Sequence, residues 1–107
     1  SGCFMFMLAE LRTYTINTGM LYQWLQLFDT EIAPRTMSAG MDIPVTAVNH
    51  ENTKFIWIRT FENETDLKIK EASFSNSEWW KNNVDYVRSH FARRTIELIH
   101  LQPSQSN

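Results

Sequence analysis

Cysteine, glycine and proline are scarce in this chain of 107 residues, which contains one Cys, three Gly and three Pro. The single cysteine, Cys3, can form neither an intramolecular disulfide nor a thiolate metal site, so a reducing compartment is the simpler expectation. The isolated glycines Gly2, Gly19 and Gly40 form no glycine-rich loop for a nucleotide phosphate. Nucleophilic catalysis has little support, because no Gly-x-Ser-x-Gly turn is present.

Long hydrophobic runs and an excess of one charge are also missing. The longest apolar run, residues 3–9, has seven residues, whereas a bilayer span needs about 20. No basic segment precedes that run, so we expect neither a membrane span nor a signal peptide. Ten Lys and Arg stand against 12 Asp and Glu, for a net charge of -2. This balance gives no basic surface for nucleic acid, and we expect no such partner.

Hydrophobic periodicity predicts an alternation of strands and helices. Each expected helix has a terminal signal, with Thr18 as a candidate N-cap, Pro34 as a site where the helix kinks or tightens, and a capping-box spacing from Ser75 to Glu78. The expected elements are a strand over residues 4–16, a helix from Met20 to about Gly40, strands over residues 43–50 and 53–61, a broken helix from Asn63 to about Phe91, and a strand over residues 93–101.

The order β-α-β-β-α-β predicts an α+β, ferredoxin-like sandwich, with helices on one face of a four-stranded antiparallel sheet. We expect one domain over residues 1–103 and a disordered tail over residues 104–107. In the strand over residues 53–61, Phe55, Trp57 and Phe61 fall on one face, and Ile56 and Ile58 on the other. Because both faces are apolar, we expect a second sheet to cover the free face in a homodimer or an assembly of dimers.

The segment Glu10-Leu11-Arg12-Thr13-Tyr14-Thr15-Ile16, followed by Gly19, resembles the opening motif of the NIPSNAP family. Further segments agree in order over residues 10–103: Leu25-Gln26-Leu27-Phe28, Glu31-Ile32-Ala33-Pro34, Ile56-Trp57-Ile58-Arg59, Glu78-Trp79 and Leu101-Gln102-Pro103. The resemblance implies a dimeric α+β barrel, an architecture shared with cofactor-independent monooxygenases, isomerases and haem-degrading enzymes. Members of the family have no settled biochemical activity. Some in animals are mitochondrial, but this chain shows no transit peptide, so we expect a cytoplasmic protein of the bacterial type.

Charged and polar side chains on the first strand are the most unusual feature of the sequence. Glu10, Arg12 and Tyr14 alternate onto one face of a strand that should be central. They would form either a structural network or the lining of a cleft for an anionic or carbonyl-bearing ligand. Trp57 and Arg59 form a second such face, and one of the adjacent Trp79 and Trp80 should lie at a pocket rim or a subunit contact. The candidate ligand-pocket residues are Arg12, Tyr14, Trp57, Arg59 and Trp79.

The three histidines, His50, His90 and His100, lack the spacing of a metal site, so we expect no metal and no cofactor. Solvent-facing or capping roles are expected for them, although His90 is the residue to test as an axial ligand of haem. Two classes of function stay open, with catalytic residues unknown. One is a binding or interaction module for a hydrophobic, polar-headed small molecule. The other is a cofactor-independent monooxygenase or isomerase, or a haem-binding enzyme.

Overall fold

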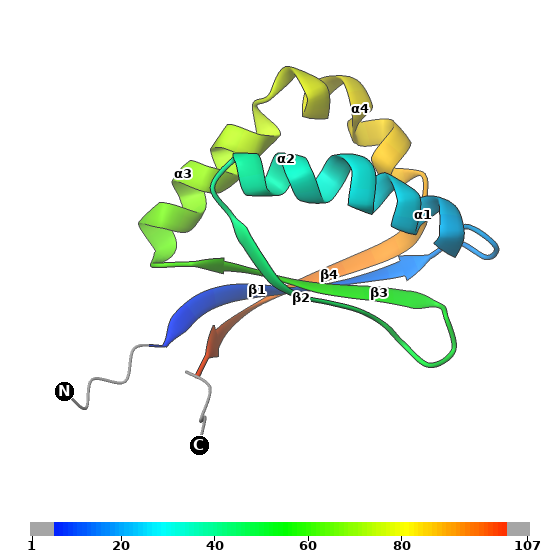
Figure 1. Cartoon of the computed structure of the whole chain (residues 1–107), viewed down its shortest axis with the longest axis horizontal. Coiled ribbons are helices and arrows are strands. Elements are labelled where there is room, and N and C mark those ends of the chain that lie inside the picture. The colour runs from blue at the N-terminus through cyan, green and yellow to red at the C-terminus, as the bar shows by residue number, and fades with distance from the viewer. Residues whose placement is uncertain (1–5, 103–107) are drawn as a thin grey trace.

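The computed structural model describes residues 6–102, which form a four-stranded antiparallel sheet with helices on one face (Figure 1). The strand order is β2-β3-β1-β4, so the predicted ferredoxin-like α+β fold is confirmed. The predicted start of the first strand at Phe4 and the predicted disordered tail lie outside the described residues. The elements are β1 (Met7–Ile16), α1 (Leu21–Leu27), the π-helical η1 (Phe28–Ile32), α2 (Ala33–Ser38), β2 (Asp42–Val48), β3 (Lys54–Phe61), α3 (Glu64–Ser75), α4 (Glu78–Arg88) and β4 (Phe91–Leu101).

The first helical stretch differs from the prediction at its start and in the turn before Pro34. Thr18 is not its N-cap, because Gly19 adopts φ of 80° in a turn and the helix begins only after Met20, which makes no side-chain cap. The helix also does not tighten at Pro34. The helix instead widens just before Pro34, where the amide of Ala33 bonds to the carbonyl of Phe28. Because proline has no amide hydrogen, a wide π turn here accommodates the missing α-helical bond.

The second helical stretch is broken, as predicted, but Ser77 rather than Ser75 caps α4. The Ser77 hydroxyl accepts a hydrogen bond from the amide of Trp80 at 3.2 Å. Ser77 has extended backbone angles, which an N-cap requires, whereas Ser75 is still part of α3. Phe91 begins β4 instead of ending the helix. The last strand therefore starts two residues earlier than the expected Arg93.

Asp66, in the first turn of α3, makes the stability of the protein depend on pH in the acid range. Its Oδ2 accepts from the amide of Glu62 at 2.9 Å and from Nζ of Lys70 at 3.0 Å, and these bonds lower the pKa of Asp66. A carboxyl whose pKa is lowered by folding stabilises the protein above its unfolded pKa, about 3.9, and loses that contribution as the pH falls through the folded value. In urea unfolding between about pH 6 and pH 3, the midpoint of wild type should fall more steeply than that of Asp66→Asn. Parallel curves would contradict this.

The side chains that face the helices come from alternate positions of β1 and β3. Across the β1–β3 pair, Glu10 lies opposite Arg59, and Arg12 lies opposite Trp57. On the other side of β1, Ile96 lies opposite Arg12. Residues directly opposite in a sheet point to the same face. The β1 row of Glu10, Arg12 and Tyr14 therefore shares one face of the sheet with the β3 row of Trp57 and Arg59. This face packs against the helices.

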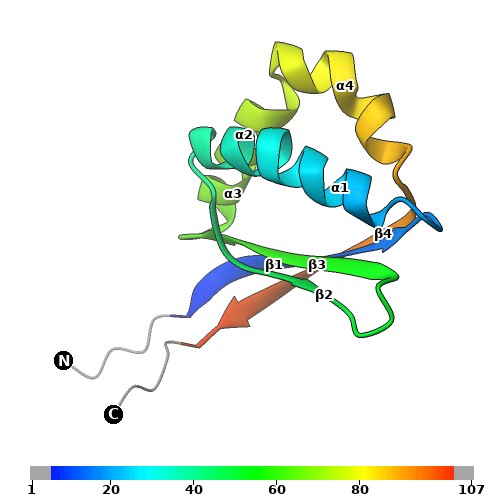
Figure 2. The ribbon, with the colours of Figure 1, turned by 45° about the vertical axis from the view of Figure 1, so that its right-hand side comes forward.

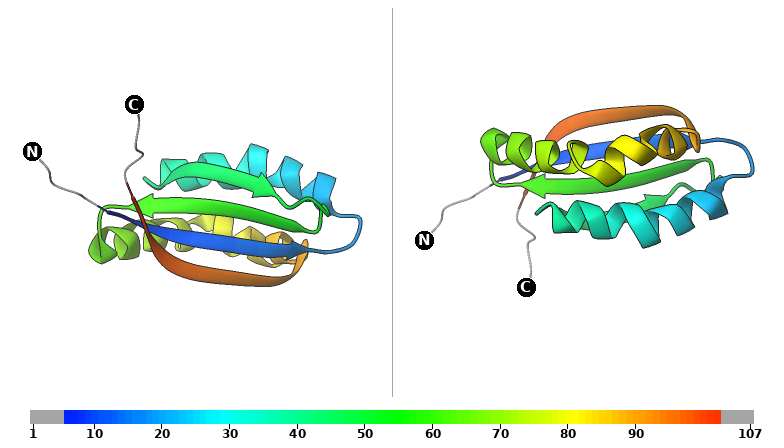
Figure 3. Two further views of the ribbon diagram at one scale, coloured as in Figure 1. Left: turned by 90° about the horizontal axis from the view of Figure 1, so that it is seen from below. Right: turned by 90° about the horizontal axis from the view of Figure 1, so that it is seen from above.

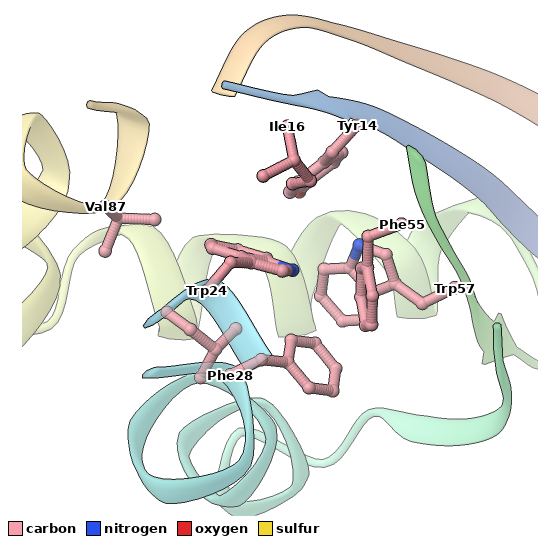
Figure 4. Close-up of a cluster of buried hydrophobic side chains, with 8 residues drawn as sticks. Tyr14, Ile16, Trp24, Phe28, Phe55, Trp57 and Val87 are labelled. Carbon is pink, nitrogen blue, oxygen red and sulfur yellow. The ribbon is translucent and has the colours of Figure 1, made fainter. Parts of the chain in front are cut away.

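The main hydrophobic cluster is largely aromatic and lies between the sheet and the helical stretch of α1 and η1 (Figure 4). The Trp24 side chain is 0 % exposed, and its ring centroid lies 5.5 Å from that of Tyr14 and 5.7 Å from that of Phe55. Phe28 contacts Trp57 edge-on, with centroids 5.0 Å apart. Such a cluster stabilises the fold and holds the rings of Tyr14 and Trp57 in fixed orientations.

Within residues 6–102, no helix covers the opposite face of the sheet, as the view from below in Figure 3 shows. Ile58 lies at the centre of this open face, between Val45 of β2 and Leu11 of β1. Ile56 lies beside Ala47 on the same face. We call Leu11, Val45, Ile56 and Ile58 the open-face cluster; Val45 is 43 % exposed and the other three are half-buried. An apolar sheet face of this kind is typical of an interface.

Candidate functional site

A cavity of about 260 Å³ lies between the sheet and the helices α3 and α4. In Figure 2, α4 stands higher above the sheet than α1 does. Of the predicted pocket residues, Arg12, Tyr14, Trp57 and Arg59 line this cavity together. Trp79 does not. Further lining residues include Glu10, Glu71, Phe74, Trp80, Arg88, Arg94 and Ile96.

Trp79 points to a different part of the molecule. Its ring packs against the main hydrophobic cluster and lies under the guanidinium of Arg35, with the Cζ atom 4.5 Å from a ring centroid. Trp80 lines the cavity instead and contacts Phe74, with centroids 5.1 Å apart. Neighbouring positions of a helix point about 100° apart, so only one of the two indoles can face the cavity. The one that does is Trp80.

The floor of the cavity is a hydrogen-bonded row of charged groups on β1 and β3. Arg12 donates through Nη1 to Oε1 of Glu10 at 3.0 Å and through Nε to the hydroxyl of Tyr14 at 3.1 Å. Arg59 donates through Nε to the same Glu10 oxygen at 2.8 Å and through Nη2 to Oε2 of Glu71 at 2.6 Å. The predicted structural network therefore exists, and it forms one wall of a cavity.

Arg12 stays charged although it is only 6 % exposed. Burial opposes the charged form and is the largest single influence on it, but Tyr14, Glu10 and Glu71 together outweigh burial and raise the pKa of Arg12 above its ordinary value. The guanidinium carbon also lies 5.4 Å from the ring centroid of Trp57, within the range of a cation–π contact. The cavity therefore presents a fixed positive charge beside aromatic rings.

The Tyr14 hydroxyl keeps its own proton available. A guanidinium can only donate, so the Tyr14 oxygen is the acceptor in its bond with Arg12. No hydrogen bond donated by this hydroxyl occurs among residues 6–102. Since Tyr14 lines the cavity and is 5 % exposed, its proton is available to a bound molecule.

Cations mark the opening of the cavity. Its exposed lining residues are Arg88 at the end of α4, and Arg94 and Ile96 on β4. Neither arginine makes a salt bridge within the described residues. Unpaired cations at an opening attract anions from solution.

The three histidines lie outside this cavity. His90 is 2 % exposed, and its Nδ1 lies 2.9 Å from the carbonyl oxygen of Tyr86 at the end of α4, while His50 and His100 are exposed. Within residues 6–102 no group of three or more His, Cys, Asp or Glu side chains could hold a metal ion. No helix in the described part of the chain is long and apolar enough to cross a membrane.

Neither a family model nor a curated protein matches the sequence. Solved structures do. A NIPSNAP family protein of unknown function from Agrobacterium tumefaciens superposes with a TM-score of 0.83 at 15 % identity, covering 92 % of this chain and 90 % of that one. An uncharacterized NIPSNAP domain protein from Burkholderia xenovorans gives 0.79 at 13 % identity, covering 87 % and 92 %.

This chain has the NIPSNAP fold. The resemblance inferred from its opening motif is confirmed at the level of the fold. The same fold extends to a more distant structure, described as an antibiotic biosynthesis monooxygenase, with a TM-score of 0.66 at 18 % identity, covering 91 % of this chain and 100 % of that one. At these identities the similarity concerns architecture, so the chemistry of the site has to come from its own residues.

On this NIPSNAP fold, part of the cavity wall was not predicted from the sequence. Trp80 could have been chosen over Trp79, because Trp80, Val84 and Val87 recur at helical spacing and mark the inward face of α4. No pattern in the sequence indicated that Glu71 would line the cavity. Glu71 reaches Arg59 only because α3 crosses the sheet there, and no local pattern predicts that contact.

Proposed function

We propose that this protein is a binding module for a small molecule with a hydrophobic body and a polar head, held in the cavity between sheet and helices. The observation that carries the proposal is the pairing of Arg12 and Tyr14 on the cavity floor with the aromatic wall of Trp57, Phe74 and Trp80. Ligand sites typically combine an apolar wall with a few fixed polar groups. The volume of about 260 Å³ suits a ligand of one or two rings.

The module acts as a homodimer or an assembly of dimers in this proposal. The open-face cluster supports it, because a monomer would leave Leu11, Ile56 and Ile58 in contact with water at the centre of the sheet. A second copy bringing the same face would cover both clusters with one symmetric contact. A cytoplasmic location stays part of the prediction.

An enzyme is the second candidate, as a cofactor-independent monooxygenase or isomerase. It is favoured by the available proton of Tyr14 beside the fixed charge of Arg12, since a phenol so placed can protonate a carbonyl or enolate oxygen. A solved structure that shares the fold is described as an antibiotic biosynthesis monooxygenase, which supports this candidate. Chemical change of a bound ligand, followed by mass spectrometry with and without oxygen, separates an enzyme from a binding module.

The test of the binding function is Tyr14→Phe. Titration of 2-naphthol, 1,4-naphthoquinone and 2-naphthoate, followed by tryptophan fluorescence and calorimetry, should reveal binding of at least one of them to wild type. Tyr14→Phe should weaken that binding by about tenfold, the value of one hydrogen bond. The control is Tyr86→Phe, which removes the same atom from a side chain that is 59 % exposed and outside the cavity.

Two outcomes would contradict the binding function. One is the absence of binding by all three compounds. The other is a Tyr14→Phe variant that loses about 1–3 kcal/mol of stability with no change in affinity, because the hydroxyl would then be only a structural partner of Arg12.

A further inference from the structure

We propose that the polar head of the ligand is a carboxylate, which sits on Arg12 and Tyr14 and enters through the opening flanked by Arg88 and Arg94. This inference rests on the proposed binding function and specifies the charge of the ligand. It comes from the balance of charges on the cavity floor, from the donors left free there, and from the residues at the opening.

The buried charges on the floor do not balance. Arg12, Arg59 and Glu10 are all less than 10 % exposed, and both guanidinium groups bond to the same oxygen of Glu10. Two positive charges thus share one buried negative charge. Glu71 supplies a second carboxylate, but it bonds to Arg59, and its side chain is 40 % exposed. Arg12 therefore shares its buried counter-charge with Arg59, and the two guanidinium groups together carry more positive charge than the one buried carboxylate offsets.

Hydrogen-bond donors remain free beside this shared counter-charge. Arg12 uses Nε for Tyr14 and Nη1 for Glu10, and its Nη2 makes no hydrogen bond within residues 6–102. The Tyr14 proton is also free, and the two side chains are joined by a bond of 3.1 Å. One carboxylate could accept from both donors, and such charge-assisted bonds are about twice as strong as neutral ones.

A neutral head would fit this site less well. A hydroxyl or carbonyl oxygen could accept the same hydrogen bonds, but without a negative charge these bonds would be weaker. A carboxamide would in addition bring an NH₂ group, which can only donate, to a place where Arg12 and Tyr14 also donate. A carboxylate is the head that satisfies both the hydrogen bonds and the charge.

The opening favours the same ligand. Arg88 and Arg94 carry positive charge at the exposed side of the cavity, and Ile96 provides an apolar surface beside them. Phe74 of α3 and Trp80 of α4 form an aromatic wall, with their rings tilted by 52° to each other. An aromatic carboxylate would be attracted by the two arginines and stabilised by stacking inside the cavity.

The decisive comparison uses two probes of nearly identical shape, 2-naphthoate and 2-naphthamide, titrated into the wild-type protein at pH 7 by calorimetry. The carboxylate should bind at least about tenfold more tightly than the amide. Equal affinity, or tighter binding of the amide, would overturn this inference and leave the binding function standing. Failure of both probes and of 2-naphthol would overturn the inference together with the binding function.

A variant at the opening tests the path independently and does not touch the buried network. Arg94→Gln should slow association of 2-naphthoate by about two- to fivefold at low salt, and the difference from wild type should shrink as salt is added. Lys81→Gln is the control, because Lys81 is an exposed cation on α4 outside the cavity. An equal effect of both variants would show that only net charge matters, and would contradict the proposed path.

Discussion

Replacing Glu10 with Gln should lower the free energy of unfolding by about 3–5 kcal/mol, a large part of the roughly 5–15 kcal/mol that stabilises a typical domain. Glu10 is 7 % exposed, and its Oε1 is the acceptor for both Arg12 and Arg59. The carbonyl oxygen of glutamine could still accept from both guanidinium groups, but it would carry no charge. Two buried guanidinium groups would then face each other across the floor without the carboxylate between them. Urea unfolding followed by tryptophan fluorescence measures the effect.

Glu71→Gln provides the comparison for that experiment. Glu71 also accepts a bond from Arg59, but its side chain is 40 % exposed, and Arg59 keeps the buried carboxylate of Glu10 as a counter-charge when Glu71 is replaced. Its loss should cost about 1 kcal/mol or less. If Glu10→Gln cost no more than Glu71→Gln, the carboxylate of Glu10 would not be the centre of the network.

Ile58→Asp should turn a dimer into monomers. Ile58 lies between Val45 and Leu11 in the middle of the open-face cluster, where a second copy would bury it. A carboxylate placed there would lose its hydration against an apolar surface and would meet the same charge from the partner. Light scattering at micromolar concentration should give about twice the chain mass of 12.6 kDa for wild type and the chain mass itself for the variant.

Ile69→Asp is the matched control. Ile69 is 65 % exposed on α3, on the opposite side of the sheet from the open-face cluster. The same chemical change there should leave the mass of the assembly unaltered. A wild-type protein that is already monomeric at micromolar concentration, or an Ile58→Asp variant that still dimerises, would refute the dimer proposed here.

Local patterns in the sequence determined the elements and much of their orientation. Alternation along β1 placed Arg12 and Tyr14 on one face, and alternation along β3 did the same for Trp57 and Arg59, because side chains of a strand point alternately to its two sides. The glycine at position 40 marked the end of the first helical stretch, where its φ is 96°. These features depend on residues close together in the chain, so a sequence contains enough to predict them.

The tertiary structure alone decided how these pieces combine into a site. Whether Arg12 and Trp57 share a face depends on the register between β1 and β3, and a shift of one residue would have separated them. Glu71 joins Arg59 only through the path of α3. Each of these contacts forms between residues distant in the chain. The charge balance on the cavity floor follows from them, because it depends on which side chains are brought together and how deeply each is buried.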